Sequence, residues 1–124
     1  RFFAATLAYQ GYAGGVNLEL ITQSHELFCN GLQPDLTILL DCPVATGLAR
    51  SRSRNKAAGT EQEEGRFEEK MLAFHERVRQ GYHALAARTP DRFVIINADQ
   101  PVADVHRELS AAVMPRLKGQ GYAV

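Results

Sequence analysis

The chain has 124 residues, of which 45% are hydrophobic, and it carries 14 basic and 14 acidic side chains. This length and hydrophobic share fit a single globular domain. The formal net charge of zero gives no long-range attraction to nucleic acid or anionic lipid, so we expect neither as a partner. No apolar run approaches the roughly 20 residues that cross a bilayer, and we expect a cytoplasmic protein without a membrane segment.

The cysteines and histidines predict neither a disulfide nor a metal site. Cys29 and Cys42 are isolated, which favours reduced core residues over a disulfide. The histidines, which we expect at the surface or the core edge, include no pair at ligand spacing; they are His25, His75, His83 and His106. We therefore predict no metal ligand in this chain.

Apolar residues at helical spacing predict helices over residues 1–30. Gly11–Gly15 should loosen or end the first helix, so two helices or one broken helix fit the pattern. The apolar run Leu36–Asp41 follows and ends in an acid, as expected of a parallel strand that is buried on both faces. Pro43 suits the first position of a helix that continues to Arg54.

Three arginines, Arg50, Arg52 and Arg54, lie on this third helix. Guanidinium groups are planar, permanently charged donors that suit phosphates. Residues four apart share a helix face, so we rank Arg50 and Arg54 above Arg52 as phosphate ligands. The alternative is a solvated helix face whose charge is balanced by the acids that follow.

The second half of the chain predicts a long helix from Gln62 to Thr89, a buried strand over Phe93–Asn97, and a last helix from Pro101 to Gly119. Strands that alternate with helices indicate a parallel α/β fold. Two buried strands cannot form a stable sheet alone. We therefore expect either the C-terminal part of a larger sheet or completion by a partner.

Two segments, Ala8–Gly11 and Pro34–Thr37, together with the arginine series, resemble the bacterial thymidylate kinase family from the middle of the enzyme to its C-terminus. The resemblance covers essentially the whole chain and is also carried by Arg1–Phe2, Leu39–Asp41, Gly47–Arg54, Arg66–Glu68 and Val78–Tyr82. It implies a three-layer P-loop kinase fold with a parallel sheet. Residues 1–124 would form the C-terminal part of that single domain, two strands plus helices, with a lid segment at about residues 50–66.

The resemblance implies transfer of the ATP γ-phosphoryl group to dTMP, giving dTDP, with Mg²⁺ and in a homodimer. Arg1 would contact the dTMP phosphate or orient the nucleotide. Thr6 and Gln10 would meet the thymine ring, and Tyr9 would lie beside the deoxyribose. From the residues alone, Tyr9 and Gln10 also fit ordinary helix surface and core.

The same resemblance implies that Arg50 and Arg54 approach ATP and act in catalysis with Arg66, at the far end of the lid. Phe67 and Glu68 would lie near the sugar and the metal region. Phe67 also fits the apolar stripe of the long helix, and Glu68 could pair with Arg66 or Lys70. Asn97–Asp99 follows the second strand, where it would border the adenine or form a plain loop.

Several features depart from the family pattern. The chain has no Gly-x-x-x-x-Gly-Lys-Ser/Thr sequence, so we expect it to be inactive alone. Gly14, Gly65 and Ala5 replace the residues common at those positions, and acids at 61, 63 and 64 would partly neutralise the lid arginines. Another P-loop nucleoside or nucleotide kinase and a non-catalytic helical interaction module remain the alternative hypotheses.

Overall fold

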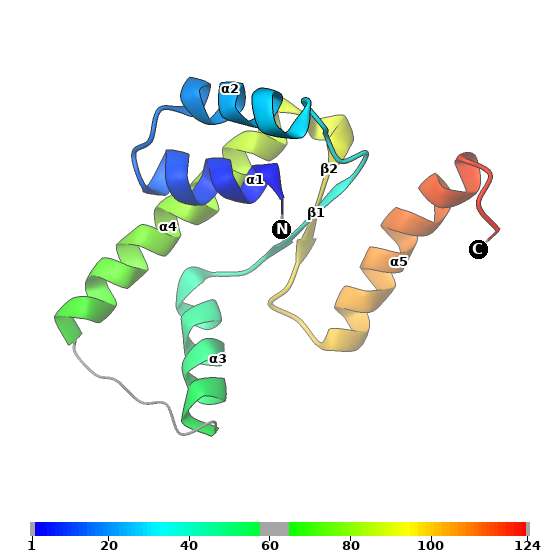
Figure 1. Cartoon of the computed structure of the whole chain (residues 1–124). Coiled ribbons are helices and arrows are strands. Elements are labelled where there is room, and N and C mark those ends of the chain that lie inside the picture. The colour runs from blue at the N-terminus through cyan, green and yellow to red at the C-terminus, as the bar shows by residue number, and fades with distance from the viewer. Residues whose placement is uncertain (1, 58–64, 124) are drawn as a thin grey trace.

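A computed structural model of the chain describes residues 2–57 and 65–123, with side chains at 2–54 and 70–123. Figure 1 shows the element order. Helical elements at the start are α1 (Phe3–Thr6), the π-helix η1 (Leu7–Ala13) and α2 (Leu18–Cys29). They are followed by β1 (Thr37–Asp41), α3 (Val44–Ala57), α4 (Gly65–Arg88), the 3-10 helix η2 (Pro90–Arg92), β2 (Phe93–Asn97) and α5 (Val102–Gly119).

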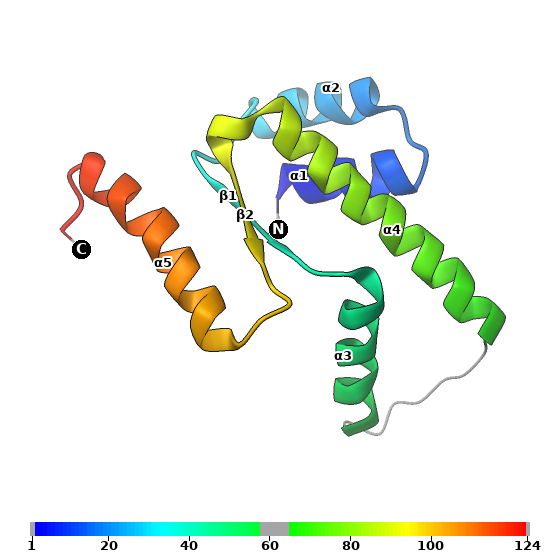
Figure 2. The same cartoon turned by 180° about the vertical axis from the view of Figure 1, so that it is seen from behind.

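The two strands pair in parallel, from Thr37 opposite Phe93 to Asp41 opposite Asn97. Their connection runs through α3 and α4, as expected when parallel strands are joined by helical crossovers. Both strands lie within one residue of the predicted ranges, and their parallel pairing is confirmed. In Figures 1 and 2, α5 lies on the opposite side of the strands from α1, α2 and α4.

The predicted break in the first helical region is confirmed between η1 and α2. Gly15 has φ +79°, a left-handed conformation that glycine adopts without steric cost. Asn17 then begins α2, because its Oδ1 accepts hydrogen bonds from the backbone N–H groups of Glu19, at 2.8 Å, and Leu20, at 3.2 Å. The sequence pattern did not predict that η1 would be a π-helix.

The core lies mainly where η1 packs against α4 and α2, and α3 and β2 each add a buried residue. Its buried apolar residues are Leu7, Ala8, Ile21, Val44, Val78, Ala86 and Ile96. His25 is buried among them, stacked on Phe3 with ring centroids 4.0 Å apart, and its Nε2 lies 2.7 Å from the Leu32 carbonyl oxygen. The expectation that every histidine lies at the surface or core edge is therefore wrong for His25.

The strands are less buried than predicted. Leu40 is 51% exposed and Ile95 is 47% exposed. The predicted burial on both faces is therefore incomplete among the described residues, because their two-stranded sheet is not fully covered on either face.

Both cysteines are free thiols, but their placement differs from a core role. Cys29 is exposed on the last turn of α2, beside Phe28, which is 82% exposed; Cys42 is partly buried. Placing Cys29 in the core was wrong, because no described element covers this end of α2. Among the described residues, none of the helices combines the length and apolar character needed to cross a bilayer.

Gly81 permits close contact between α4 and η1. A Cβ atom at this position would lie 2.7 Å from the Tyr12 Cβ and 2.9 Å from its Cγ. We expect Gly81→Ala to lower the free energy of unfolding by about 1–3 kcal/mol, although alanine favours helix, because overpacking must displace Tyr12. Denaturant unfolding measures this change.

Gly47→Ala is the matched control on α3, since its Cβ would lie at an ordinary 3.5 Å from the Cys42 Sγ. We expect it to be neutral or slightly stabilising. Equal unfolding midpoints for Gly81→Ala and the unsubstituted protein would contradict the packing argument.

Candidate functional site

Asp41, the last residue of β1, anchors a cluster at the carboxyl end of the strands. Arg79 donates two hydrogen bonds to its carboxylate, from Nε to Oδ1 at 2.8 Å and from Nη2 to Oδ2 at 2.9 Å. The His83 Nε2 lies 3.2 Å from the Asp41 Oδ2. Arg79 and His83 are four residues apart and share one face of α4. A planar guanidinium that binds a carboxylate in this two-pronged way fixes orientation as well as distance, so α4 is held against the end of β1.

The electrostatics of this cluster favour ionised Asp41, whose side chain is 17% exposed. The hydrogen bonds from Arg79 hold the pKa of Asp41 below its usual value; His83 acts in the same direction, and burial opposes it. The same hydrogen bonds raise the pKa of Arg79. The cluster is therefore a stable ion pair over the ordinary pH range.

The turn after β2 is joined directly to Asp41. The Ala98 backbone N–H donates to the Asp41 carbonyl oxygen at 2.6 Å. The Asp99 backbone N–H donates to the Asn97 Oδ1 at 2.8 Å, a local bond typical of Asn in turns. These two bonds fix the backbone of the turn independently of any contact from α3.

Arg50 reaches the same turn from α3. Its Nη1 donates to the Ala98 carbonyl oxygen at 2.8 Å, and its Nη2 lies 3.3 Å from the Asp99 Oδ1. The side chains are exposed, Arg50 by 50% and Asp99 by 42%. A solvent-accessible guanidinium thus lies at the carboxyl end of parallel strands, the edge at which open α/β sheets bind ligands.

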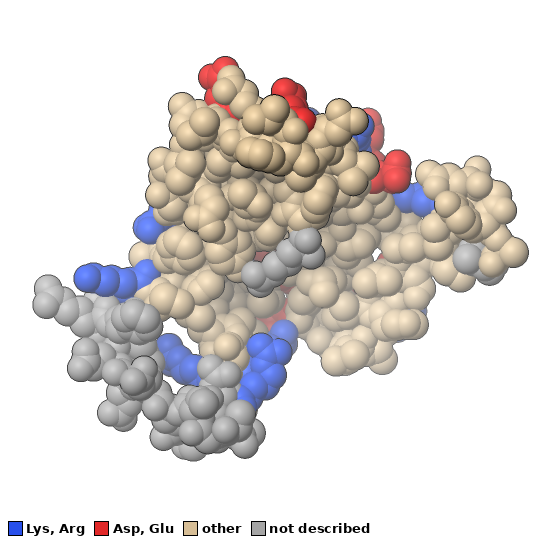
Figure 3. All heavy atoms as spheres, viewed as in Figure 1, with Lys and Arg blue, Asp and Glu red and all other residues tan. Residues whose placement is uncertain are grey.

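The surface charge agrees with this placement. In Figure 3, Lys and Arg side chains lie around α3 in the lower part of the view, whereas the acidic side chains on this face lie mainly along the top. Arg50, Arg52 and Arg54 are the described basic side chains of α3, and Arg50 is paired with Asp99. A local group of arginines can bind an anionic ligand although the chain has zero net charge.

Thr6 and Gln10 lie in a different place, in a groove between the first helical segment and α2. The groove has a volume of about 700 Å³. Its other lining residues include Phe2, Phe3 and Leu20. Thr6 and Gln10 are both exposed, and they add polar groups to a mainly apolar groove, a composition typical of small-molecule sites.

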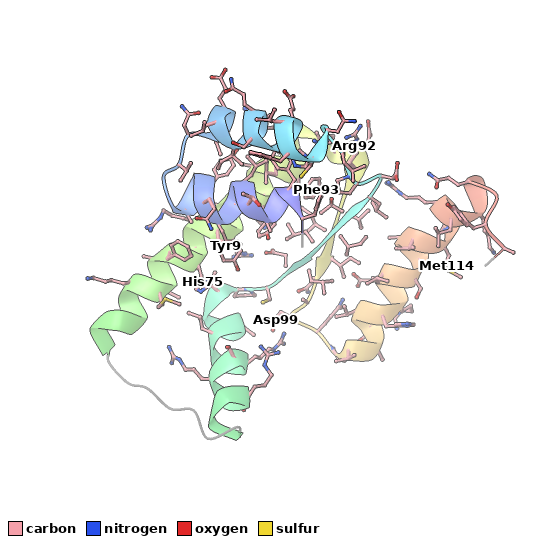
Figure 4. All side chains as sticks on the ribbon, viewed as in Figure 1. Tyr9, His75, Arg92, Phe93, Asp99 and Met114 are labelled. Atoms are coloured by element: carbon pink, nitrogen blue, oxygen red, sulfur yellow. The ribbon has the colours of Figure 1, made fainter. Side chains whose placement is uncertain are left out.

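Tyr9 faces away from that groove, toward α4. Its ring centroid lies 6.1 Å from that of Phe74, 6.4 Å from that of His75 and 6.5 Å from that of Tyr82. Figure 4 shows Tyr9 and His75 close together and Asp99 in the turn after β2. Tyr9 also lines a second groove of about 620 Å³ along β1. Edge-to-face and tilted aromatic contacts of this kind fix the orientation of the Tyr9 ring.

Some predicted site residues fall outside the described part. Arg1 is one of them, as are the side chains of Arg66, Phe67 and Glu68, whose backbone belongs to the first turn of α4. In the predicted lid, α3 continues to Ala57 instead of ending at Arg54, and residues 58–64 are outside the described ranges. Arg54 is exposed on α3.

Sequence reasoning gave no site role to Arg79, His83 or the Asp99 carboxylate. Arg79 and His83 are four residues apart on a predicted helix, and Arg79 lies in the Val78–Tyr82 segment of the family resemblance, but nothing in the sequence linked that helix to Asp41. Within the described residues, no group of three or more His, Cys, Asp or Glu side chains is arranged to hold a metal ion.

Comparison with known proteins identifies the family of this chain. Residues 1–109 match the family model for thymidylate kinase. The chain belongs to the thymidylate kinase family. It is 48% identical over 121 residues to the thymidylate kinase of Desulfovibrio desulfuricans, covering 98% of this chain and 56% of that relative.

Two other thymidylate kinases show the same extent of similarity. That of Trichlorobacter lovleyi is 50% identical over 117 residues, 94% of this chain and 55% of the relative. That of Maridesulfovibrio salexigens is 44% identical over 119 residues, 96% of this chain and 55% of the relative. The chain therefore spans about half the length of the curated thymidylate kinases it matches.

The Asp41 cluster should make stability depend on pH. Because Asp41 has a lower pKa in the folded chain than its usual 3.8, its stabilising contribution is fully present above that value and is lost as pH falls through the folded pKa. We expect Asp41→Asn to cost about 1–3 kcal/mol near pH 7. The difference in unfolding free energy from the unsubstituted protein should shrink below about pH 4.

Denaturant unfolding from pH 7 to pH 2 checks this expectation. Arg79→Gln provides the control background, in which Asp41→Asn should cost less and its cost should vary less with pH. A cost of Asp41→Asn that stays constant down to pH 2 would contradict the role of the ion pair.

Proposed function

We propose that this chain forms the C-terminal part of a thymidylate kinase that transfers the γ-phosphoryl group of ATP to dTMP, giving dTDP. Membership of the thymidylate kinase family supports the activity. The observation that carries the proposal is the position of Arg50 on α3, from which its guanidinium contacts the turn after β2. Phosphoryl transfer needs alignment and positive charge around the phosphates more than covalent chemistry from the protein.

In this proposal β1 and β2 belong to the three-layer parallel sheet of a P-loop kinase. The half-exposed Leu40 and Ile95 support this arrangement, because further strands and helices would cover them. The chain contains no Gly-rich phosphate-binding loop with its lysine, so that part of the ATP site must come from elsewhere in the enzyme.

We assign ATP to the carboxyl edge of the strands, with Arg50, Arg54 and Arg66 as the catalytic arginines. An arginine placed beside the transferring phosphate can raise the rate by several orders of magnitude. Mg²⁺ would neutralise phosphate charge when bound. The described residues include no group of three or more His, Cys, Asp or Glu side chains that could hold a metal ion, and we derive no step through the ion.

The dTMP site would lie beside the first helical segment. Thr6 and Gln10 would meet the thymine ring, and Tyr9, whose ring is held by the α4 aromatics, would contact the deoxyribose. Arg1 would bind the phosphate, and Phe67 and Glu68 would lie near the sugar.

We also propose that the enzyme is a cytoplasmic homodimer. Leu20, Leu27 and Phe28 on α2 are 57%, 77% and 82% exposed. Exposed apolar side chains grouped on one helix are typical of a protein interface, and a symmetric dimer would bury the same surface of both copies.

The complete gene product that contains residues 1–124 should phosphorylate dTMP with ATP in preference to other nucleosides and monophosphates. Arg50→Ala should lower turnover by about tenfold or more, and Arg52→Ala should have a smaller effect, because Arg50 reaches the strand edge. A coupled ADP-release assay over a substrate panel measures both. Preference for another acceptor, or equal effects of the two substitutions, would contradict the assignment.

Residues 1–124 expressed alone should show no dTMP-dependent ATP consumption, because the sequence has no phosphate-binding loop. The same assay tests this, with the complete gene product as the positive control. Measurable turnover by the isolated chain would mean that the described residues suffice to position ATP.

A further inference from the structure

Arg50 makes one short hydrogen bond and one longer contact with the turn after β2. The guanidinium has five N–H donors. Nη1 makes a bond of 2.8 Å to the Ala98 carbonyl oxygen, and Nη2 makes a longer contact of 3.3 Å with a single Asp99 oxygen. The Ala98 bond anchors the side chain, whereas the Asp99 contact holds one end of the guanidinium by charge.

The Asp99 contact is the one that an anionic ligand can replace. Both side chains are substantially exposed, at 50% and 42%, and exposed ion pairs contribute only about 0.2–1 kcal/mol. A polyphosphate carries more charge than one carboxylate and can accept two parallel N–H bonds from arginine. Replacing Asp99 would leave the bond to Ala98 in place.

The backbone of the turn does not depend on the Arg50–Asp99 contact. The Asn97 Oδ1 accepts the Asp99 N–H, and the Asp41 carbonyl oxygen accepts the Ala98 N–H. Removing only the negative charge of Asp99 should therefore leave the Ala98 carbonyl oxygen available to Arg50. A substitution at Asp99 thus tests the charge contact without removing the bonds that hold the turn.

We propose that the Asp99 carboxylate competes with the phosphates of ATP for Arg50 and so weakens ATP binding. This inference rests on the proposed kinase function and adds a residue that limits affinity for the phosphoryl donor. Asp99 acts in two ways: it occupies one end of the guanidinium, and it repels a phosphate that approaches the same end.

The test is a double-substitution cycle on the complete gene product, with ATP binding measured by titration calorimetry. Asp99→Asn should lower the Kd for ATP by about two- to fivefold, the range expected from loss of an exposed competing ion pair. Arg50→Gln should raise the Kd, and Asp99→Asn should have little effect in the Arg50→Gln background. Thermal unfolding of each variant checks that the fold is retained.

Asp91→Asn is the matched control, because it removes the same charge from an exposed aspartate beside the opposite end of β2. It should leave the Kd unchanged. An unchanged or higher Kd for Asp99→Asn would overturn the inference. An equal decrease in the Kd for ATP when Asp99→Asn is made in the Arg50→Gln background would also overturn it. The decrease would then come from removing a negative charge in general and not from freeing Arg50.

Measuring ATP binding and dTMP phosphorylation separately distinguishes this inference from the proposed function. If the gene product binds ATP with the expected pattern but does not phosphorylate dTMP, the proposed function fails and the inference stands. If it phosphorylates dTMP and Asp99→Asn does not tighten ATP binding, the inference fails alone. Absence of ATP binding would overturn both.

Discussion

The ion pair between Asp41 and Arg79 connects the parts of this structure on which the site depends. Its two hydrogen bonds, of 2.8 and 2.9 Å, hold α4 against the end of β1. The backbone of Asp41 holds the turn after β2 through Ala98, and Ala98 in turn binds Arg50 from α3. Asp41 thus links β1 to α4 through its side chain and to the turn after β2 through its backbone, and Arg50 joins α3 to the same turn.

The proposed donor and acceptor sites depend on different kinds of interaction. The donor side, at the strand ends, uses charge and backbone hydrogen bonds around Arg50. The acceptor side uses aromatic packing, which holds the Tyr9 ring, and the polar side chains of Thr6 and Gln10. This difference suits the two ligand groups, because phosphates require positive charge, whereas a base and a sugar require shape and a few directed polar contacts.

Much of the architecture followed from local patterns. Both strands, the long helix before β2 and the last helix lie close to their predicted ranges, because hydrophobic period and proline position act over a few residues. The family could also be recognised from its motifs. Burial was predicted less well: Leu40, Ile95 and Cys29 are more exposed than an apolar run suggests, because burial depends on what packs against a segment and not on the segment itself.

The sequence alone determined the order of the main helices and strands, the parallel pairing and the family, and it predicted Arg50 and Arg54 as phosphate ligands. Only the tertiary structure decided that Arg79 and His83 meet Asp41 and that Arg50 is shared between Ala98 and Asp99. It also separated Tyr9 from Gln10, although the two are adjacent in sequence. The physical reason is that helical spacing fixes which residues share a face, whereas the partner of that face is set by the packing of segments distant in the chain.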